Sequence, residues 1–243
     1  MAASELDPLL ASLSAARLQR RAVMSTSAER AAHALREQVT EGTLRSGTRL
    51  PEVRLAEALG VSRNTLREAL SQLVAERILV RVEHRGVLVA TPDTAAVRDV
   101  YAARRIIEPA AVLHGPAVDA AHLDALDAAV REGTAASGRG DWTGVGSANQ
   151  HFHRAVVALA GSERLVAQME LLLAEMRLFF HQMGDPEPFH APYLDENAVI
   201  AGHLRAGRRE AAATRLAAYL GTAEEQLVAG FGEIAERART TPA

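Results

Sequence analysis

Cysteine and lysine are both absent from this chain of 243 residues, and aromatic residues make up only 4% of it. Without cysteine the chain can form no disulfide, no thiolate metal site and no cysteine nucleophile. With so few aromatic residues the core must consist mostly of Leu, Val and Ala, which favours helices over a β-sandwich. No apolar run approaches the ~18 residues needed to span a membrane, and the N-terminus lacks the pattern of a signal peptide. We therefore expect a cytoplasmic protein without a membrane partner.

Charge is unevenly distributed along the chain. All 27 basic residues are arginine, and the net charge of -3 combines a basic first part with an acidic second part. Residues 1–91 carry 13 arginines against 10 acidic residues, whereas residues 92–243 carry 14 against 20. The asymmetry suggests that the two parts have different partners.

Turn signals divide the first part of the chain into a tail and a small domain. Residues 1–24 are expected to form a flexible N-terminal tail. A domain is expected over 25–91, because the boundary signal Thr91-Pro92-Asp93 follows it. Within this domain the periodicity predicts helices over 28–41, 52–59 and 62–76, and strands over 78–82 and 87–89 that join at a hairpin tip, 83–86.

The spacing around Gly60 is typical of a helix-turn-helix. Two helices that cross closely need a small residue at their contact, here Ala56, and a turn residue that tolerates φ > 0, here Gly60. Leu66, Leu70 and Leu73 then take the inward positions of the second helix, and its opposite face must point outward. The outward residues are Ser62, Arg63, Asn64, Arg67 and Gln72.

This outward face is suited to DNA. Arginine can donate two hydrogen bonds to guanine O6 and N7 in the major groove, and Arg63 and Arg67 lie four residues apart. Ser62, with the free amides of the first turn, suits a phosphate, and Thr65 suits a phosphate or a thymine methyl group.

The hairpin that follows has the character of a wing. Arg85 beside Gly86 places a long cation next to a residue without a side chain, which suits the minor groove or the DNA backbone. The alternative is a solvated face on a three-helix protein-interaction module. The helix-turn-helix spacing, the arginine-bearing helix and the basic hairpin tip together favour DNA binding.

The sequence after the boundary at residues 91–93 predicts helices only. They are expected over 94–115, 119–138, 141–160, 162–183, 193–206 and 208–238, with a break of three prolines between Gly184 and Pro192. We expect an all-α antiparallel bundle over 94–238. The predicted fold is therefore mainly α, with an N-terminal winged helix-turn-helix that contains a small β-hairpin and a C-terminal helical bundle.

Both parts resemble known families. The stretch from Leu44 to Val89, which includes GTRLPEVRLAEALGVSRNTLREALSQLVAERILV and the hairpin RVEHRGVLVA, resembles the winged helix of the GntR family of bacterial transcription regulators. The second part is similar to the FCD class of effector domains, through VYAARRIIEPAA, NQHFHRAVVALAGSERL and HLRAGRREAAATRLAAYL. The likeness covers roughly residues 27–230 and implies an effector-binding and dimerisation role for the bundle.

The resemblance implies two sets of site residues. The implied DNA contacts are Ser62, Arg63, Asn64, Thr65, Arg67, Arg85 and Gly86, and Arg54 adds a phosphate contact. An effector pocket is expected from Arg104, Asn149, His153, Arg177, His181, Asn197 and Tyr219, where Arg104 supplies a cation for a carboxylate.

The resemblance also implies a metal that this sequence does not favour. In the family an Asp or Asn and the His after it, here Asn149 and His153, help to bind a divalent metal with two later histidines. Those later positions are Asn197 and Tyr219, and an amide and a phenol are poor ligands for Zn²⁺ or Ni²⁺. We therefore expect no metal in the pocket, with Asn149 and His153 as remnant ligands, and we expect surface or packing roles for His151, His190 and His203.

The sequence thus predicts a regulator rather than an enzyme. It has no Gly-rich phosphate loop, no GxSxG and no HExxH motif. We expect a repressor that binds a pseudo-palindromic operator as a homodimer and is controlled by a small organic acid. The alternative is a metal- or metabolite-sensing protein that acts through protein contacts and carries a vestigial DNA-binding head.

Overall fold

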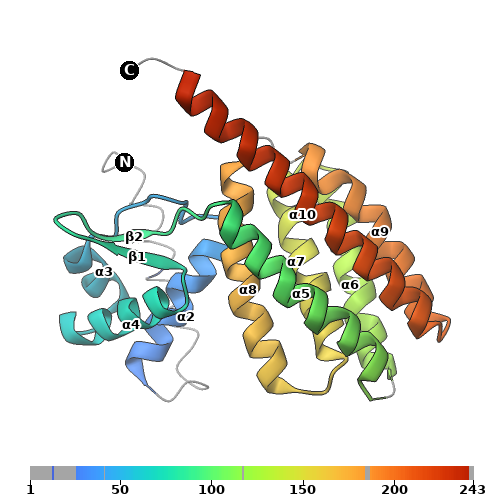
Figure 1. Ribbon diagram of the computed structural model, residues 1–243. Helices are drawn as coiled ribbons and strands as arrows, with labels where there is room; N and C mark the ends of the chain where they lie inside the picture. The colour runs from blue at the N-terminus through green and yellow to red at the C-terminus, as the bar shows by residue number, and fades with distance from the viewer. Residues whose placement is uncertain (1–12, 14–25, 41, 117, 184–186, 241–243) are drawn as a thin grey trace. The chain divides into compact units, whose positions relative to one another are not determined.

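The computed structural model describes residues 13, 26–40, 42–116, 118–183 and 187–240, with side chains as far as residue 233. The chain divides into two compact units, Met1–Thr91 and Pro92–Ala243. Figure 1 shows short helices and a hairpin in the first unit, and longer helices in the second. We call them the head and the helical unit and describe each by itself.

Three helices and a hairpin form the described part of the head. The helices are α2 (Ser27–Thr40), α3 (Glu52–Leu59) and α4 (Arg63–Ala75), and the strands are β1 (Leu79–Val82) and β2 (Gly86–Val89). Helices α2 and α3 both pack against α4. Leucines at the inward positions of all three helices are at most 1% exposed and form the core: Leu35, Leu55, Leu66, Leu70 and Leu73.

The turn between α3 and α4 is the one that the sequence predicts. Gly60 ends α3 in the left-handed region, at φ 61° and ψ 40°. Its amide and that of Val61 donate to the carbonyls of Glu57 and Ala56, which closes the end of the helix. Ser62 then caps α4, because its hydroxyl accepts the Thr65 amide at 3.0 Å. Backbone geometry at Gly60 and the cap at Ser62 thus fix where α4 begins.

The hairpin is a sheet of two antiparallel strands, widened by the segment before α3. Leu79 pairs with Val89 and Val82 with Gly86. On the other side of β2, the Leu50 amide donates to the Val87 carbonyl, and the Val89 amide donates to Thr48. The chain before α3 is therefore held against the wing.

The helical unit consists of long helices around one apolar core. They are α5 (Thr94–His114), α6 (Ala120–Ser137), α7 (Trp142–Ala158), α8 (Glu163–Gln182), α9 (Glu187–Arg205) and α10 (Arg209–Thr240). Helix α5 packs along α10, and α7 contacts α5, α6, α8 and α9. Because α7 touches four other helices, side chains on it are well placed to join the others. Among the described residues, no helix is both long and apolar enough to cross a membrane.

Helix α9 begins earlier than the sequence predicts. The prolines before residue 193 indicate a break, but the helix runs from Glu187 through Pro188 and Pro192. Pro188 lies in the first turn, where no amide hydrogen is needed. Pro192 cannot donate to the Pro188 carbonyl one turn back, and the Gln226 side-chain amide donates to that carbonyl instead, at 3.4 Å. A side chain of α10 thus compensates for the proline, which the local sequence could not reveal.

Gly60 provides a test of the turn. Gly60→Ala should destabilise the head by roughly 1–2 kcal/mol, because an L-residue is strained in the left-handed region. Gly60→Asn should recover most of that loss, since Asn tolerates this conformation. Urea unfolding of both variants, followed by circular dichroism, measures the difference, and equal stability of Gly60→Ala and the wild type would show that the turn is not strained by a side chain.

Candidate nucleic-acid interface and effector pocket

The outward face of α4 carries the polar residues that the sequence assigns to it. Ser62, Arg63, Asn64 and Arg67 are all exposed. Two of these side chains are held by carboxylates: Asn64 donates to Glu68 at 3.1 Å, and Arg67 Nε donates to Glu52 at 3.1 Å. The face is thus accessible and partly ordered by hydrogen bonds.

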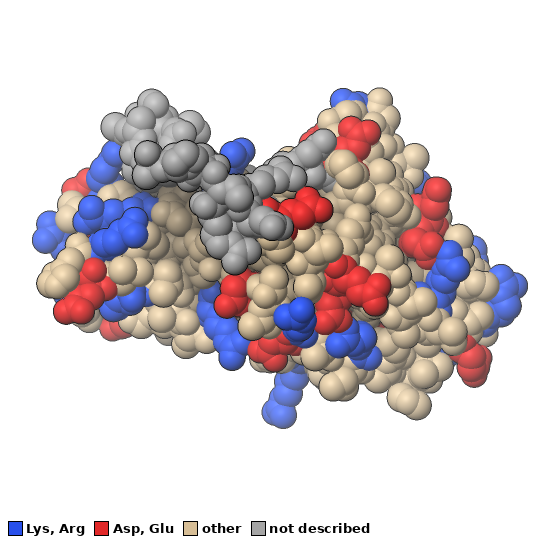
Figure 2. All heavy atoms as spheres, turned by 45° about the horizontal axis from the view of Figure 1, so that its top comes forward, with Lys and Arg blue, Asp and Glu red and all other residues tan. Residues whose placement is uncertain are grey.

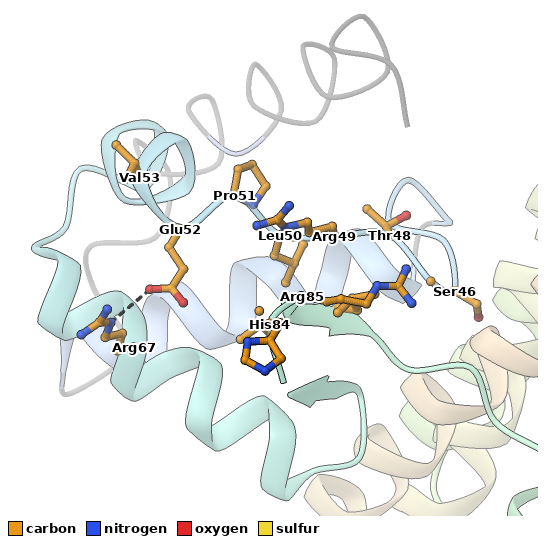
Figure 3. A pocket seen from close by; sticks show the side chains of 14 residues that line it. Ser46, Thr48, Arg49, Leu50, Pro51, Glu52, Val53, Arg67, His84 and Arg85 are labelled. Atoms are coloured by element: carbon orange, nitrogen blue, oxygen red, sulfur yellow. Dashed lines mark hydrogen bonds and ion pairs between the residues drawn. The ribbon is translucent and has the colours of Figure 1, made fainter. Parts of the chain in front are cut away.

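A groove of about 1070 Å³ lies beside this face, between the wing tip, the segment before α3 and Arg67 (Figure 3). Four of its lining residues can carry positive charge, namely Arg49, Arg67, His84 and Arg85, and one carries negative charge, Glu52. By contrast, Figure 2 shows arginines and acidic residues interspersed on one face of the helical unit. The groove is open, and most of its charged side chains are cationic, which suits a polyanion.

The structure separates the predicted DNA contacts into two groups. Arg67, Arg85 and Gly86 line the groove. The remaining predicted contacts lie outside its lining: Arg54, Ser62, Arg63, Asn64 and Thr65. Ser62 and Thr65 also bond to each other through their hydroxyls, at 2.8 Å.

Among the groove residues that can carry charge, sequence reasoning missed three: Arg49, Glu52 and His84. Arg49 faces Leu88 across an isolated bridge, so its place depends on the pairing of the 48–50 segment with β2. His84 has φ 59° at the hairpin tip, an uncommon conformation for a residue other than glycine. The basic pattern of the segment was visible in the sequence, but the pairing that brings it to the wing was not.

A buried polar network occupies the interior of the helical unit. Arg104 Nε donates to Glu108 Oε1 at 2.6 Å, and the other oxygen of Glu108 lies 2.7 Å from His153 Nδ1. His153 Nε2 lies 3.0 Å from the Tyr219 hydroxyl, which also lies 3.0 Å from Asn149 Oδ1. The network joins α5, α7 and α10 through one continuous set of contacts.

The network reaches α9 through one further hydrogen bond. Asn197 Nδ2 donates to Asn149 Oδ1 at 2.7 Å. Four predicted pocket residues, Asn149, His153, Asn197 and Tyr219, are therefore in one cluster, with Arg104 attached through Glu108. Glu108 was missed as a site residue, although its position four residues after Arg104 on a helix was the available signal.

The other predicted pocket residues lie apart from this network. Arg177 donates to the Thr143 carbonyl at 3.2 Å and lies close to Gly146 and His190. The hydrogen bonds that define the network do not include His181. His190 is 2% exposed and stacks edge-on against Phe180 and Phe189, which is a packing role.

Burial controls the charges of the network. Burial lowers the pKa of His153, Arg104 acts in the same direction, and together they outweigh the Glu108 carboxylate. Burial alone would raise the pKa of Glu108, but Arg104 and His153 outweigh it, and the pKa lies below its ordinary value. Burial also raises the pKa of Tyr219. At neutral pH the network therefore holds an ionised Arg104–Glu108 pair, a neutral imidazole and a neutral phenol.

Several polar atoms of this interior lack a partner. With a neutral His153 that donates from Nδ1, the one hydroxyl proton of Tyr219 must serve either His153 or Asn149. Arg104 Nη1 and Nη2 and Asn197 Oδ1 are buried without a hydrogen-bond partner among the described residues. Buried polar groups are normally satisfied, so these atoms call for a ligand or water.

The space beside the network is small. The cavity lined by Asn149, His190 and Asn197 has a volume of about 10 Å³, enough for roughly one water molecule. Gly133 and Ala148 also line it, and a side chain at Gly133 would meet Leu194 at 2.9 Å. This cavity therefore has no room for a molecule larger than water.

The residues of the network do not fit a transition metal. Both ring nitrogens of His153 are within hydrogen-bond distance of other groups, and Asn149 Oδ1 has two such neighbours. The remaining donors are an amide and a phenol, where Zn²⁺ and Ni²⁺ favour imidazole or thiolate. Across the described residues, His, Cys, Asp and Glu nowhere gather in threes that could hold a metal ion.

Comparison with family models places both parts of the chain. The model described as "Bacterial regulatory proteins, gntR family" matches residues 27–89, and the FCD domain model matches residues 99–222. The first covers the helix-turn-helix and the wing, and the second covers the helices that hold the buried network.

Individual proteins show the same similarity. A crystal structure from Rhodococcus sp. RHA1, assigned as a transcriptional regulator GntR, is 38% identical, covers 84% of this chain and 99% of its own, and superposes with a TM-score of 0.77. An HTH-type transcriptional regulator of Agrobacterium vitis is 27% identical over 53% of this chain and 77% of its own length. The gluconate operon transcriptional repressor of Bacillus subtilis is 35% identical over 32% of each chain.

The two buried histidines make the helical unit acid-sensitive. Burial lowers the pKa of His153 and lowers that of His190 to about 3, below the unfolded value of about 6.5. Their stabilising contribution is fully present above about pH 6.5 and is lost as pH falls, because the unfolded state then binds protons that the folded state excludes. For His190 the loss should reach roughly 2 kcal/mol at pH 5.

Thermal unfolding at pH 7 and pH 5 measures this effect. His190→Phe, which keeps a ring beside Phe180 and Phe189, should reduce the pH dependence of the transition. His151→Gln, at an exposed position, serves as the control and should not change it. A pH dependence that is the same in His190→Phe and the wild type would contradict this assignment.

Proposed function

The chain belongs to the GntR family of bacterial regulatory proteins and carries an FCD domain, and we propose that it is a cytoplasmic repressor released from its operator by a small organic acid. As a GntR-family regulator it is a DNA-binding protein and not an enzyme. The observation that supports sequence-specific DNA binding is the exposed face of α4 beside the groove with its cationic side chains. In this proposal Arg63 and Arg67 contact bases, and the wing tip and Ser62 contact the backbone.

We propose further that the chain acts as a homodimer. Closed two-fold symmetry is the commonest arrangement of such oligomers, and a two-fold dimer presents two identical recognition helices. The operator would then be pseudo-palindromic, with one half-site for each α4.

The proposed effector site is the buried network of the helical unit. The observation that supports a carboxylate is Arg104, whose Nη1 and Nη2 have no acceptor although its side chain is 0% exposed. A carboxylate accepts two hydrogen bonds from such a group. Because the interior is closed, the acid can enter only when helices separate, so binding favours an open form over the form described here. That difference in affinity between two forms is what an effector needs to control DNA binding.

Arg67 tests the DNA-binding part of this proposal. Arg67→Ala should weaken binding to the operator by on the order of tenfold or more, the value of a bidentate arginine–guanine contact. Arg139→Ala, which removes an exposed arginine of the helical unit, is the matched control. Gel shifts over a series of salt concentrations measure the operator affinity of both variants. The salt series is needed because binding through phosphates alone gives a steep salt slope without sequence preference. Native operator affinity in Arg67→Ala would refute the assignment of α4.

Ligand binding in the presence of a chelator tests the effector site. In EDTA, a panel of small organic acids should contain members that raise the unfolding temperature and release the operator. Their uncharged amides should do neither, because they cannot neutralise Arg104. If only the metal-loaded protein responds, the metal-independent site is wrong.

Elemental analysis provides the second arm of that test. The purified wild type should hold less than one Zn or Ni per chain. The double variant Asn197→His, Tyr219→His restores the two imidazoles that the family implies and should take up more metal than the wild type. About one metal ion per wild-type chain would overturn the interpretation of Asn197 and Tyr219.

A further inference from the structure

The ion pair between Glu52 and Arg67 crosses from α3 to α4 at the edge of the groove. Arg67 Nε donates to Glu52 Oε2 at 3.1 Å, as the dashed line in Figure 3 shows. The Arg67 side chain is 68% exposed and that of Glu52 is 27% exposed. Glu52 lies in the first turn of α3, where a carboxylate is favoured by the helix dipole. Glu52 is therefore the more buried partner of the pair, and Arg67 is the one that faces solvent.

Stability does not account for this contact. An ion pair this exposed contributes only about 0–1 kcal/mol to folding, because water and salt screen it. Glu52 is also the one acidic residue among those that line the groove. A carboxylate at this position opposes the binding of a polyanion and cannot increase the overall affinity for DNA. Its effect must therefore be on the discrimination between DNA sequences.

The geometry of the contact indicates what that effect is. A guanidinium has five N–H donors in a rigid fork. The bond to Glu52 uses Nε and leaves the Nη1–Nη2 edge, which has two parallel donors for guanine O6 and N7. An arginine held in this way loses less conformational freedom when it meets a base than one that moves freely.

We propose that Glu52 is a specificity-determining positioning residue: it orients Arg67 for a guanine and disfavours binding to the phosphate backbone alone. The inference rests on the proposed reading of DNA by α4. Glu52 acts in two ways that both favour sequence discrimination. It restricts the directions in which Arg67 can donate, and its negative charge weakens contacts that depend only on phosphates.

The test compares one charge change at two positions of α3. The probes are a duplex selected by the wild-type chain from a random-sequence pool and a scrambled duplex of the same composition. Glu52→Gln should lower the ratio of the two affinities by about tenfold, part of the discrimination of one bidentate contact, while binding to the scrambled duplex stays equal or becomes tighter. Glu57→Gln makes the same charge change at an exposed site outside the groove and should leave the ratio within about twofold of the wild-type value.

A double variant shows whether Glu52 acts through Arg67. If it does, Glu52→Gln should lower the ratio less when it is added to Arg67→Ala than when it is made in the wild type, because only the effect of its charge on phosphate contacts remains. Equal unfolding temperatures of Glu52→Gln and Glu57→Gln confirm that the change is not a loss of folding. A full additional loss in the double variant would overturn the positioning role.

The remaining outcomes separate this inference from the proposed function. If the wild type discriminates, Arg67→Ala does not, and Glu52→Gln keeps the wild-type ratio, then the role of Glu52 is wrong and the role of α4 stands. Both proposals fail if the wild type binds the two duplexes equally well. They also fail if Arg67→Ala retains the wild-type sequence preference.

Discussion

A fully buried ion pair constrains the interior of the helical unit. Arg104 and Glu108 lie one helical turn apart on α5, and both side chains are 0% exposed. Removing two charges from water costs several kcal/mol per ion, and the pair recovers this only with good geometry and further hydrogen bonds. Glu108 gains a second bond from His153. The pair leaves no net charge, so the neighbouring groups must stay neutral, and the pKa directions of His153 and Tyr219 agree with this.

The same charge balance bears on the metal that the family resemblance implies. A divalent cation beside His153 would add two positive charges to an interior that already holds Arg104. Such a site needs several anionic or imidazole ligands, whereas the network offers His153, a Glu108 carboxylate that is already paired with Arg104, and an amide and a phenol at Asn197 and Tyr219. These two side chains preserve the hydrogen bonding between α7, α9 and α10 without a cation.

The sequence predicted the parts of the fold that depend on local rules. Gly60, Ser62 and the helical spacing of leucines in α4 each determine structure within a few residues, so the turn, the cap and the helix could be predicted directly. The start of α9 did not, because Pro192 is tolerated through Gln226 of another helix. Glu52 and Arg49 were missed for the same reason: their positions depend on α4 and on β2, which lie many residues away. Sequence periodicity predicts on which face of a helix or strand a residue lies. It does not predict which residues of other elements contact that face.

The connection between the wing and the helix that carries the buried ion pair is short. Strand β2 ends at Val89, and α5, which carries Arg104 and Glu108, begins at Thr94. Four residues, 90–93, separate them, and Asp93 caps α5 by accepting the Ala96 amide at 2.9 Å. A short connection that ends in a helix cap therefore joins the wing strand to the helix that carries Arg104 and Glu108. An effector that binds the buried network, as proposed, would have to offset the free energy of opening the interior, so its apparent affinity would fall with the population of the open form. The proposed acid would therefore act only at concentrations higher than its affinity for the open form alone requires.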